Sequence, residues 1–364
     1  MAATLEREGH CVSLLDLSSE DFHIDGEFDF VGVTCLTNTY PKTLSILKKV
    51  RQKLPDTKIV AGGPHVTFLP EEALDTGLIN QVVCGEGDDT ICDIVSGKNK
   101  QPILEAKPVD LSKLPLPARG LLSFKYDVAG ITVNRGCPYT CAFCVRQRLF
   151  DVCRLRDPAL IKAELKGLQD FDYQYFNLYD NLNISEAHAI SVVKAVHDSG
   201  IKLPWGAELR ADKLTAELAR LLSKTGCRAI GVGVESGSER VLKTIHKDQD
   251  PKLVAHGIEH AKQAGLIVQA YFVLGLPGET WSTFKGTLAY LKQLKLGEED
   301  KIDFFIATPY PGSDLWTNKD KYGINILHQK WDLWDTEHIV METRDLNTAD
   351  IEEMRAQALE SLDF

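Results

Sequence analysis

The chain has 364 residues, a length that predicts about two domains. Its apolar content of 44% and charged content of 26% are ordinary for a globular protein, and no apolar run approaches the ~20 residues that a membrane span requires. With 52 acidic against 41 basic residues the net charge is −11, which disfavours a nucleic-acid substrate because phosphate backbones would be repelled.

Cysteine usage indicates the compartment. Nine cysteines, an odd number spread through a long chain, argue against a disulfide framework and for a reducing environment. The N-terminus lacks the basic, apolar and small-residue regions of a secretory signal sequence. We therefore expect a cytoplasmic protein.

The first hundred residues alternate short apolar strands with helical patterns, which predicts a parallel α/β sheet. The expected strands are residues 11–17, 30–36, 58–61 and 81–84, and the expected helices are 41–53 and 88–95. Glycines follow two of these strands, in Gly62-Gly63-Pro64-His65 and in Gly85-Glu86-Gly87. Such glycines let a ligand approach the backbone at the carboxyl edge of a sheet. Each turn taken singly is more typical of a structural turn than of a binding site.

Four segments in this region together resemble the cobalamin-binding domain that precedes many radical SAM cores. They are Asp29-Phe30-Val31-Gly32-Val33-Thr34, Val60-Ala61-Gly62-Gly63-Pro64-His65, Pro70-Glu71-Glu72-Ala73-Leu74 and Val83-Cys84-Gly85-Glu86-Gly87. The resemblance covers residues 1–97 and implies a doubly wound, Rossmann-like domain with cobalamin contacts from Gly62, Gly63, His65, Gly85 and Glu86. The sequence has no Asp-x-His-x-x-Gly, the motif whose histidine binds cobalt in other cobalamin domains. His65 is therefore expected to shape its loop or face the corrin ring rather than bind the metal.

The sequence begins inside a helical pattern, whereas the related domains have a strand before that helix. In a doubly wound order the first strand lies centrally, and its loss leaves inner strands with unpaired backbone groups. We therefore expect a domain that lacks its first strand. Either the sequence starts too late or the domain is rearranged, and the otherwise intact pattern favours the first explanation.

A second unit follows residues 98–127, which are rich in proline and leucine and are typical of a linker. Six expected strands alternate with helices and predict a partial (βα)6 barrel over residues 128–316: 131–134, 175–180, 205–210, 228–235, 267–274 and 302–308. Asp157-Pro158 and Asp250-Pro251 each place an N-cap acceptor before a first-turn proline. Gly265 is expected to end the second of these helices.

Residues 317–364 are expected to form a C-terminal helical extension. In it, Trp331, Trp334 and a helix near residues 348–362 are expected to cover the open side of the barrel.

Three cysteines, Cys137, Cys141 and Cys144, follow the first barrel strand at spacings of four and three residues. Three thiolates without an adjacent fourth suit a 4Fe-4S cluster that keeps one iron open to a small molecule. Three cysteines buried along a helix would show the same spacing, but Gly136 and Pro138 favour an irregular loop. A zinc site with Cys153 as its fourth ligand is the other alternative.

The C-x₃-C-x₂-C spacing, with Phe143 before the last cysteine, resembles the signature of the radical SAM superfamily. Three later segments resemble its branch with N-terminal cobalamin domains: Glu235-Ser236-Gly237-Ser238, Gly275-Leu276-Pro277-Gly278-Glu279-Thr280 and Pro309-Tyr310-Pro311-Gly312. The resemblance implies that Cys137, Cys141 and Cys144 hold the cluster. It also implies contacts of Glu235 and Arg210 with S-adenosylmethionine.

The ends of the expected barrel strands carry polar side chains that suit the same cofactor. The Asp180 carboxylate suits the methionyl ammonium, although an Asp at a strand end is as often only a turn cap. The Arg210 guanidinium suits the methionyl carboxylate. Glu235 and Ser236 suit the ribose hydroxyls or the amino-acid moiety.

Together the resemblances imply a cobalamin-dependent radical SAM methyltransferase. An electron from a partner such as flavodoxin or ferredoxin would lead to a 5′-deoxyadenosyl radical, and methylcobalamin would supply a methyl group to an unactivated carbon. The alternatives are radical cyclisation or rearrangement without methyl transfer, methylthiolation of transfer RNA, and a non-catalytic cluster- or cobalamin-binding protein. The acidic charge opposes an RNA substrate, and the intact cysteine triad opposes a non-catalytic protein. No motif selects among small-molecule, lipid and peptide substrates.

Overall fold

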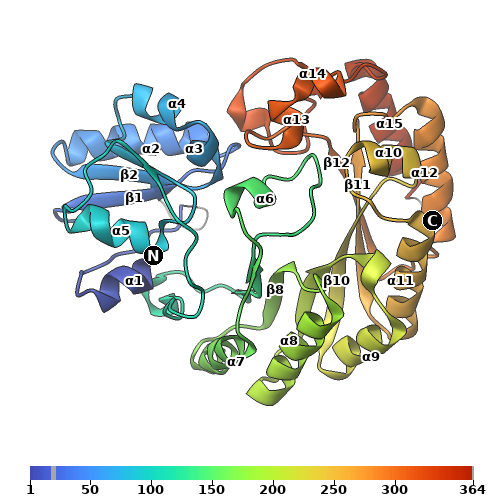
Figure 1. The fold of residues 1–364 in the computed structure, drawn as a ribbon, viewed down its shortest axis with the longest axis horizontal. Helices are drawn as coiled ribbons and strands as arrows, with labels where there is room; N and C mark the ends of the chain where they lie inside the picture. Colours follow the sequence, from blue (N-terminus) through green and yellow to red (C-terminus); the bar gives the residue numbers. More distant parts are fainter. Residues whose placement is uncertain (18–21, 363–364) are drawn as a thin grey trace.

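Two parallel α/β units make up the chain in the computed structural model, which describes residues 1–17 and 22–362 (Figure 1). The N-terminal unit contains a four-stranded sheet in the order β1-β2-β3-β4. Its strands are β1 (Phe30–Thr34), β2 (Lys58–Gly62), β3 (Gln81–Cys84) and β4 (Ile103–Glu105), and all neighbours pair in parallel.

Helices cover both faces of this sheet, which confirms the doubly wound prediction. The first face carries α2 (Tyr40–Lys53), α3 (Pro64–Phe68) and α4 (Pro70–Asp75), and the second carries α1 (Ala2–Arg7) and α5 (Gly87–Val95). Successive residues of β2 point to opposite faces, so Ile59 packs in the first core and Val60 in the second. Helical crossovers of this kind are what parallel neighbours require.

Two predictions for this unit are wrong in detail. Residues 11–17 form no strand and do not pair with the outer edge of β1 in the described structure. β1 is consequently an edge strand, and none of its five residues is buried. The segment expected as a linker contributes β4, which pairs with β3 and completes the sheet on its other side.

The second unit is built on a six-stranded parallel sheet in the order β12-β11-β10-β9-β8-β5, with β5 and β12 at its edges. Its strands are β5 (Val128–Thr132), β8 (Tyr175–Asn181), β9 (Trp205–Leu209), β10 (Cys227–Glu235), β11 (Ile267–Leu274) and β12 (Lys301–Ile306). Its helices are α7 (Pro158–Gly167), α8 (Glu186–Ser199), α9 (Ala216–Lys224), α10 (Glu239–Thr244), α11 (Pro251–Gln263) and α12 (Trp281–Gln293). This arrangement confirms the partial barrel.

Local signals position several of these elements as expected. The Asp157 and Asp250 carboxylates each accept a hydrogen bond of 2.8 Å from the backbone two residues on, so α7 and α11 begin where the Asp-Pro pairs predicted. Gly265 has φ +75° just beyond the end of α11. The first barrel strand, however, ends at Thr132 rather than at residue 134. Residues Asn134–Arg135 instead form β6, which pairs in antiparallel fashion with β7 (Arg154–Leu155).

The C-terminal region is less helical than expected. It contains α13 (Asp314–Thr317), α14 (Lys319–Tyr322), the antiparallel pair β13 (Asn325–Ile326) and β14 (Met341–Glu342), a 3₁₀ turn at Trp331–Leu333, and α15 (Thr348–Glu360). α15 packs beside β12 through Ile351 and Met354. No helix among residues 1–17 and 22–362 is long and apolar enough to cross a membrane.

Trp331 and Trp334 pack against the N-terminal unit rather than over the open barrel, which corrects the expectation for them. Both belong to the apolar core formed with α2, α3 and β2, and their rings contact each other at a centroid distance of 4.8 Å. The Trp331 indole donates a 2.8 Å hydrogen bond to Glu72 of α4. The C-terminal region therefore fastens the two units together.

Replacing Trp334 tests this attachment. Its side chain is fully buried, so Trp334→Ala should lower the free energy of unfolding by about 3–5 kcal/mol, measured by urea denaturation. Trp334→Phe is the matched control, because it keeps most of the packing and removes an indole N–H that has no partner among the described residues. A loss below about 1 kcal/mol for the alanine variant would show that the contact is not stabilising.

Candidate active site

The three cysteines lie in one irregular loop between β6 and α6 (Arg146–Leu149). Its centre is fixed by backbone hydrogen bonds: Ala142 N donates to Ile245 O at 2.8 Å, and Leu315 N donates to Ala142 O at 3.0 Å. Ala142 is fully buried, while Cys137, Cys141 and Cys144 are partly exposed. Cysteines buried along a helix are therefore excluded, and the loop presents thiols at a surface.

Burial and neighbouring cations shift the pKa values of these thiols in opposite directions. Burial raises the pKa of Cys141 to about 11, and Lys247 works against this increase. Burial also raises the pKa of Cys144, against the effect of Arg146. Both increases in pKa favour the protonated thiols, so binding a metal releases protons and depends on pH.

Lys247 is a buried cation beside the loop that no sequence pattern identified. Its ammonium donates a 2.7 Å hydrogen bond to the Glu235 carboxylate. Burial alone would lower the pKa of Lys247, but Glu235 and the nearby Cys141 thiol raise it overall. It also lies 5.9 Å from the centre of the Phe143 ring. Lys247 follows α10 and reaches the loop only through the tertiary fold.

The two carboxylates predicted at strand ends both flank the cysteine loop. Asp180 is the penultimate residue of β8 and pairs with Arg146, and Glu235 ends β10 and pairs with Lys247. Both have left-handed backbones, with φ of +80° and +62°. Non-glycine residues adopt this conformation at a cost, and they persist at sites where the surrounding structure holds them. The bend turns each carboxylate away from its strand direction and toward the loop cations.

Gly233 makes room for the pair beside it. A Cβ atom at this position would lie 2.3 Å from Glu235 Oε1 and 2.8 Å from Lys247 Nζ. A side chain on this part of β10 would therefore separate the buried ion pair.

Arg210 and Ser236 are engaged elsewhere in this arrangement. The Arg210 guanidinium binds both oxygens of Asp212 at 3.0 Å and donates to the Lys247 carbonyl, and it lies 4.1 Å from the centre of the Tyr139 ring. Ser236 is buried against the hydroxyl of Thr287, at 3.1 Å. The predicted contacts of Arg210 and Ser236 with S-adenosylmethionine remain predictions.

A three-thiol cluster site fits this loop. The sulfur ligands of a 4Fe-4S cluster bind separate irons, so they need not converge on one point as ligands of a single ion do. Within the described ranges, no three His, Cys, Asp or Glu side chains are placed to hold one metal ion. Three thiols on one loop, with Lys247 and Arg146 available to balance thiolate charge, suit the cluster better than zinc.

The glycines predicted to meet cobalamin lie at the carboxyl edge of the N-terminal sheet. Gly62 ends β2, and a Cβ there would meet only Val83 O, at 3.9 Å, so the backbone is open to a ligand. Gly63, at φ +100°, and Gly85, at φ +90°, hold the turns beside it. Leu36, which follows β1, is 46% exposed. An open backbone edge beside an apolar side chain fits a large, partly apolar ring.

His65 and Glu86 do not face that edge. His65 has no exposed surface and packs between Tyr40 and Trp331, at ring distances of 4.1 and 5.1 Å. This placement favours the loop-shaping interpretation of His65. The Glu86 carboxylate is 4% exposed and binds Arg135 and Arg154, which flank the cysteine loop.

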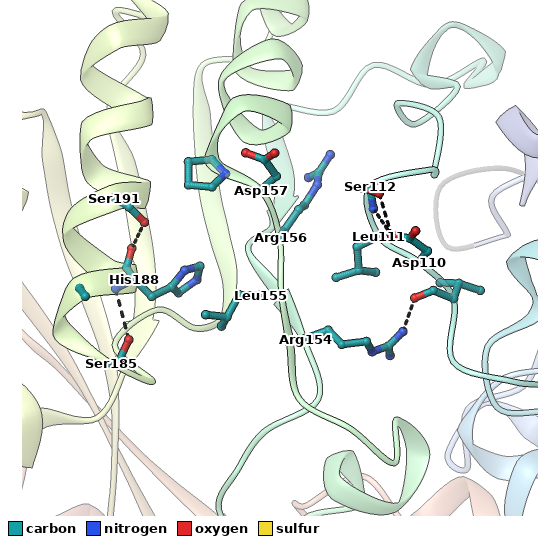
Figure 2. A pocket seen from close by; sticks show the side chains of 13 residues that line it. Asp110, Leu111, Ser112, Arg154, Leu155, Arg156, Asp157, Ser185, His188 and Ser191 are labelled. Carbon is teal, nitrogen blue, oxygen red and sulfur yellow. Dashed lines mark hydrogen bonds between the residues drawn. The ribbon is translucent and has the colours of Figure 1, made fainter.

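A cavity of about 600 Å³ lies beside the β6–β7 ladder, outside the cysteine loop (Figure 2). The linker, β7 and the start of α8 line it, with Leu111, Arg154 and His188 among its residues. None of the residues predicted to bind a cofactor is among them.

Two family models match this chain. The Radical SAM superfamily model matches residues 131–291, and the B12 binding domain model matches residues 1–95. The first covers the end of β5, the cysteine loop and the next four barrel strands in full, and the second covers α1 to α5.

The chain is similar to an uncharacterized methyltransferase, PH0819, of Pyrococcus horikoshii, with 27% identity over 98% of this chain and 85% of the relative. It is also similar to the anaerobic magnesium-protoporphyrin IX monomethyl ester cyclase of Rubrivivax gelatinosus, with 26% identity over 79% of this chain and 58% of that protein. Among solved structures, the radical S-adenosylmethionine methyltransferase TsrM of Kitasatospora setae has the same fold. It superposes with a TM-score of 0.75 and 16% identity, over 99% of this chain and 84% of TsrM.

The buried state of His65 predicts how stability depends on pH. Burial lowers the pKa of His65 to about 4, below the value of ~6.5 in an unfolded chain. Between pH 6.5 and 4 the unfolded chain therefore binds a proton at His65 that the folded chain does not bind. Lowering the pH through this range should reduce the free energy of unfolding by up to about 3 kcal/mol. Urea unfolding measured across this pH range should show a smaller decrease in the free energy of unfolding for His65→Gln than for the wild type.

His256→Gln, which replaces an exposed histidine on α11, is the control and should follow the wild type. Equal pH dependence of the wild type and His65→Gln would contradict the buried, neutral state of His65.

Proposed function

We propose, from the premise that this chain belongs to the radical SAM superfamily and carries a B12 binding domain, that it is a cobalamin-dependent radical SAM methyltransferase. The observation that carries the proposal is the three-cysteine loop at the carboxyl end of an open parallel barrel, whose flanking residues Arg135 and Arg154 bind Glu86 in the turn after β3 of the N-terminal unit. A cluster and a corrin ring held at these two edges would share one crevice.

Each part of the site has a role under this proposal. Cys137, Cys141 and Cys144 would hold a 4Fe-4S cluster with one iron left open, and Asp180 and Glu235 would accept hydrogen bonds from the amine or hydroxyls of S-adenosylmethionine. Gly62, Gly63 and Gly85 would admit cobalamin to the sheet edge. When bound, the cluster and S-adenosylmethionine supply a 5′-deoxyadenosyl radical, and cobalamin supplies the methyl group.

The cations beside the cysteines would stabilise the cluster. Lys247 and Arg146 lie close enough to act on the thiols, and each is paired with a carboxylate that holds it in place. Positive charge near bound thiolates favours their deprotonated form. Asp180 and Glu235 would then each have two roles: one carboxylate oxygen binds a cation, and the second oxygen stays available to a ligand.

Radical chemistry without methyl transfer is the second candidate. The similarity to a cyclase favours it, although that relative is covered over only 58% of its length. Methyl transfer yields S-adenosylhomocysteine alongside 5′-deoxyadenosine, and cyclisation or rearrangement yields only the latter, so the products separate the two. Either reaction requires a one-electron donor, for which flavodoxin or ferredoxin is suitable. The substrate class and the cytoplasmic location remain predictions.

Alanine substitutions test the cluster ligands. Cys137→Ala, Cys141→Ala and Cys144→Ala should each reduce the iron bound after anaerobic reconstitution from about four per chain to near zero. Cleavage of S-adenosylmethionine should be lost with it. Cys153→Ala is the control and should keep both, whereas a zinc site with Cys153 as fourth ligand would lose its metal. Retained cleavage in Cys141→Ala would contradict the proposal.

Corrinoid content tests the methyl-transfer half of the proposal. The protein should be purified anaerobically from cells supplied with cobalamin, and the corrinoid released by acid and quantified. We expect about one corrinoid per chain, since a doubly wound domain offers one such edge. A chain that assembles the cluster and cleaves S-adenosylmethionine but binds no corrinoid would favour the cobalamin-free reaction.

A further inference from the structure

Two arginines stand side by side at the base of the cysteine loop. β6 leads into the loop and β7 lies beyond it, and the two strands pair with Arg135 directly opposite Arg154. Like charges on one rung of a ladder repel each other, so the pairing needs a compensating anion. Neither arginine is freely solvated, since their side chains are only 23% and 20% exposed.

The compensating anion comes from the other unit of the chain. Glu86 lies in the turn after β3, and its Oε2 accepts hydrogen bonds from Arg135 Nη1 at 2.8 Å and Arg154 Nη1 at 3.2 Å. Its Oε1 accepts a further bond from Arg154 Nη2. Asp88, at the start of α5, binds Arg135 Nη1 at 2.6 Å. Burial would raise the pKa of Asp88, but Arg135 and the amino group of Met1 together hold that pKa below its usual value.

Arg154 also binds the segment between the units. Its Nη1 donates a 2.6 Å hydrogen bond to the carbonyl of Val109, which is buried. Figure 2 shows this side chain reaching away from His188 and α8 toward that carbonyl. The N-terminal unit, the linking segment and both arms of the cysteine loop thus meet around one carboxylate.

Both oxygens of Glu86 are occupied by guanidinium groups, so its carboxylate has little capacity left for a cofactor. We propose that Glu86 is a positioning residue: it clamps the two arms of the cysteine loop to the N-terminal unit and so sets the separation of cluster and corrin ring. The clamp itself follows from the contacts above, and its effect on the cluster–corrin separation rests on the proposed function.

Removing the charge of Glu86 should release one arm more than the other. Arg135 keeps the Asp88 carboxylate as a partner, whereas Arg154 keeps the backbone carbonyls of Val109 and Val152 and no carboxylate among the described residues. A buried charge that loses its partner is strongly unfavourable, so the β7 arm should open and loosen the loop. Arg154→Gln removes the same contact from the other side and provides a second test should Glu86→Gln not fold.

Glu164 provides a closely matched control. Its carboxylate is also 4% exposed and also binds two arginines, Arg119 and Arg156, each at 2.5 Å. It belongs to α7 and makes no bond to the N-terminal unit in the described structure. Glu164→Gln should therefore cost similar stability without freeing the cysteine loop from that unit.

Hydrogen exchange on the full, cofactor-free chain is the primary measurement. We expect the amides of residues 136–144 to exchange about tenfold faster or more in Glu86→Gln and in Arg154→Gln. The double variant should exchange no faster than either single variant, as expected for two residues that act through one contact. Unchanged exchange in both single variants, or an equal increase in Glu164→Gln, would overturn the clamp.

The loaded protein tests the consequence for the cofactors. Microwave power saturation of cob(II)alamin, read by electron paramagnetic resonance, should change between cluster-free and cluster-loaded wild type, and this change should be smaller in Glu86→Gln. An equal change in Glu86→Gln would overturn the positioning role. A wild type that binds no corrinoid would contradict the proposed function, while the exchange result would still decide the clamp.

Discussion

Parallel pairing is the constraint on which the rest of the structure depends. Neighbouring strands in both main sheets run parallel, so their connections cross over the faces and their carboxyl ends gather at one edge. The two edges adjoin: the turn after β3 reaches the cysteine loop, and Phe68, which follows β2, packs against Gly312, which follows β12. Loops that are distant in the sequence therefore lie beside each other at the carboxyl ends of the strands, where ligands of parallel α/β proteins bind.

Several buried charges lie near these strand ends, and each of them is paired with an opposite charge. Three such groups are Glu235 with Lys247, Asp180 with Arg146, and Glu86 with two arginines. Removing these charges from water is unfavourable, and the short, direct contacts between opposite charges offset that unfavourable free energy. Such pairs add little to stability compared with apolar packing, but they specify geometry because only one arrangement satisfies both partners. A radical enzyme needs such geometry, since its reactive species must meet the substrate before anything else.

The apolar counterpart of these pairs is the contact of Trp331 and Trp334 with the N-terminal core. It closes the chain on itself, because residues more than 250 positions apart, such as Glu72 and Trp331, become direct partners. The same contact buries His65, which explains why a histidine in the loop predicted to bind cobalamin does not face the carboxyl edge of the sheet. Long-range packing of this kind leaves no local pattern in the sequence.

Local chemistry was the reliable part of the sequence analysis. Strand periodicity, Asp-Pro helix starts and the glycines at strand ends act within a few residues, and they predicted both sheets and the irregular cysteine loop. The strand predicted at residues 11–17 was wrong because an apolar pattern does not by itself decide whether a segment joins a ladder, and β4 was missed because three residues show too short a pattern. Lys247 was missed because a lone lysine after a helix resembles any surface lysine.

The sequence by itself determined the kind of chemistry, through three thiols at cluster spacing and glycines after two strands of the N-terminal sheet, because ligand type and backbone freedom are properties of single residues and their neighbours. Only the tertiary structure decided the assignment of the surrounding charges. In the folded chain Arg210 and Glu86 bind other protein side chains, and His65 is buried in a core. Lys247 lies beside the cysteine loop, where it pairs with Glu235. Electrostatic roles depend on distance and burial, and both are set by which distant segments the fold brings into contact.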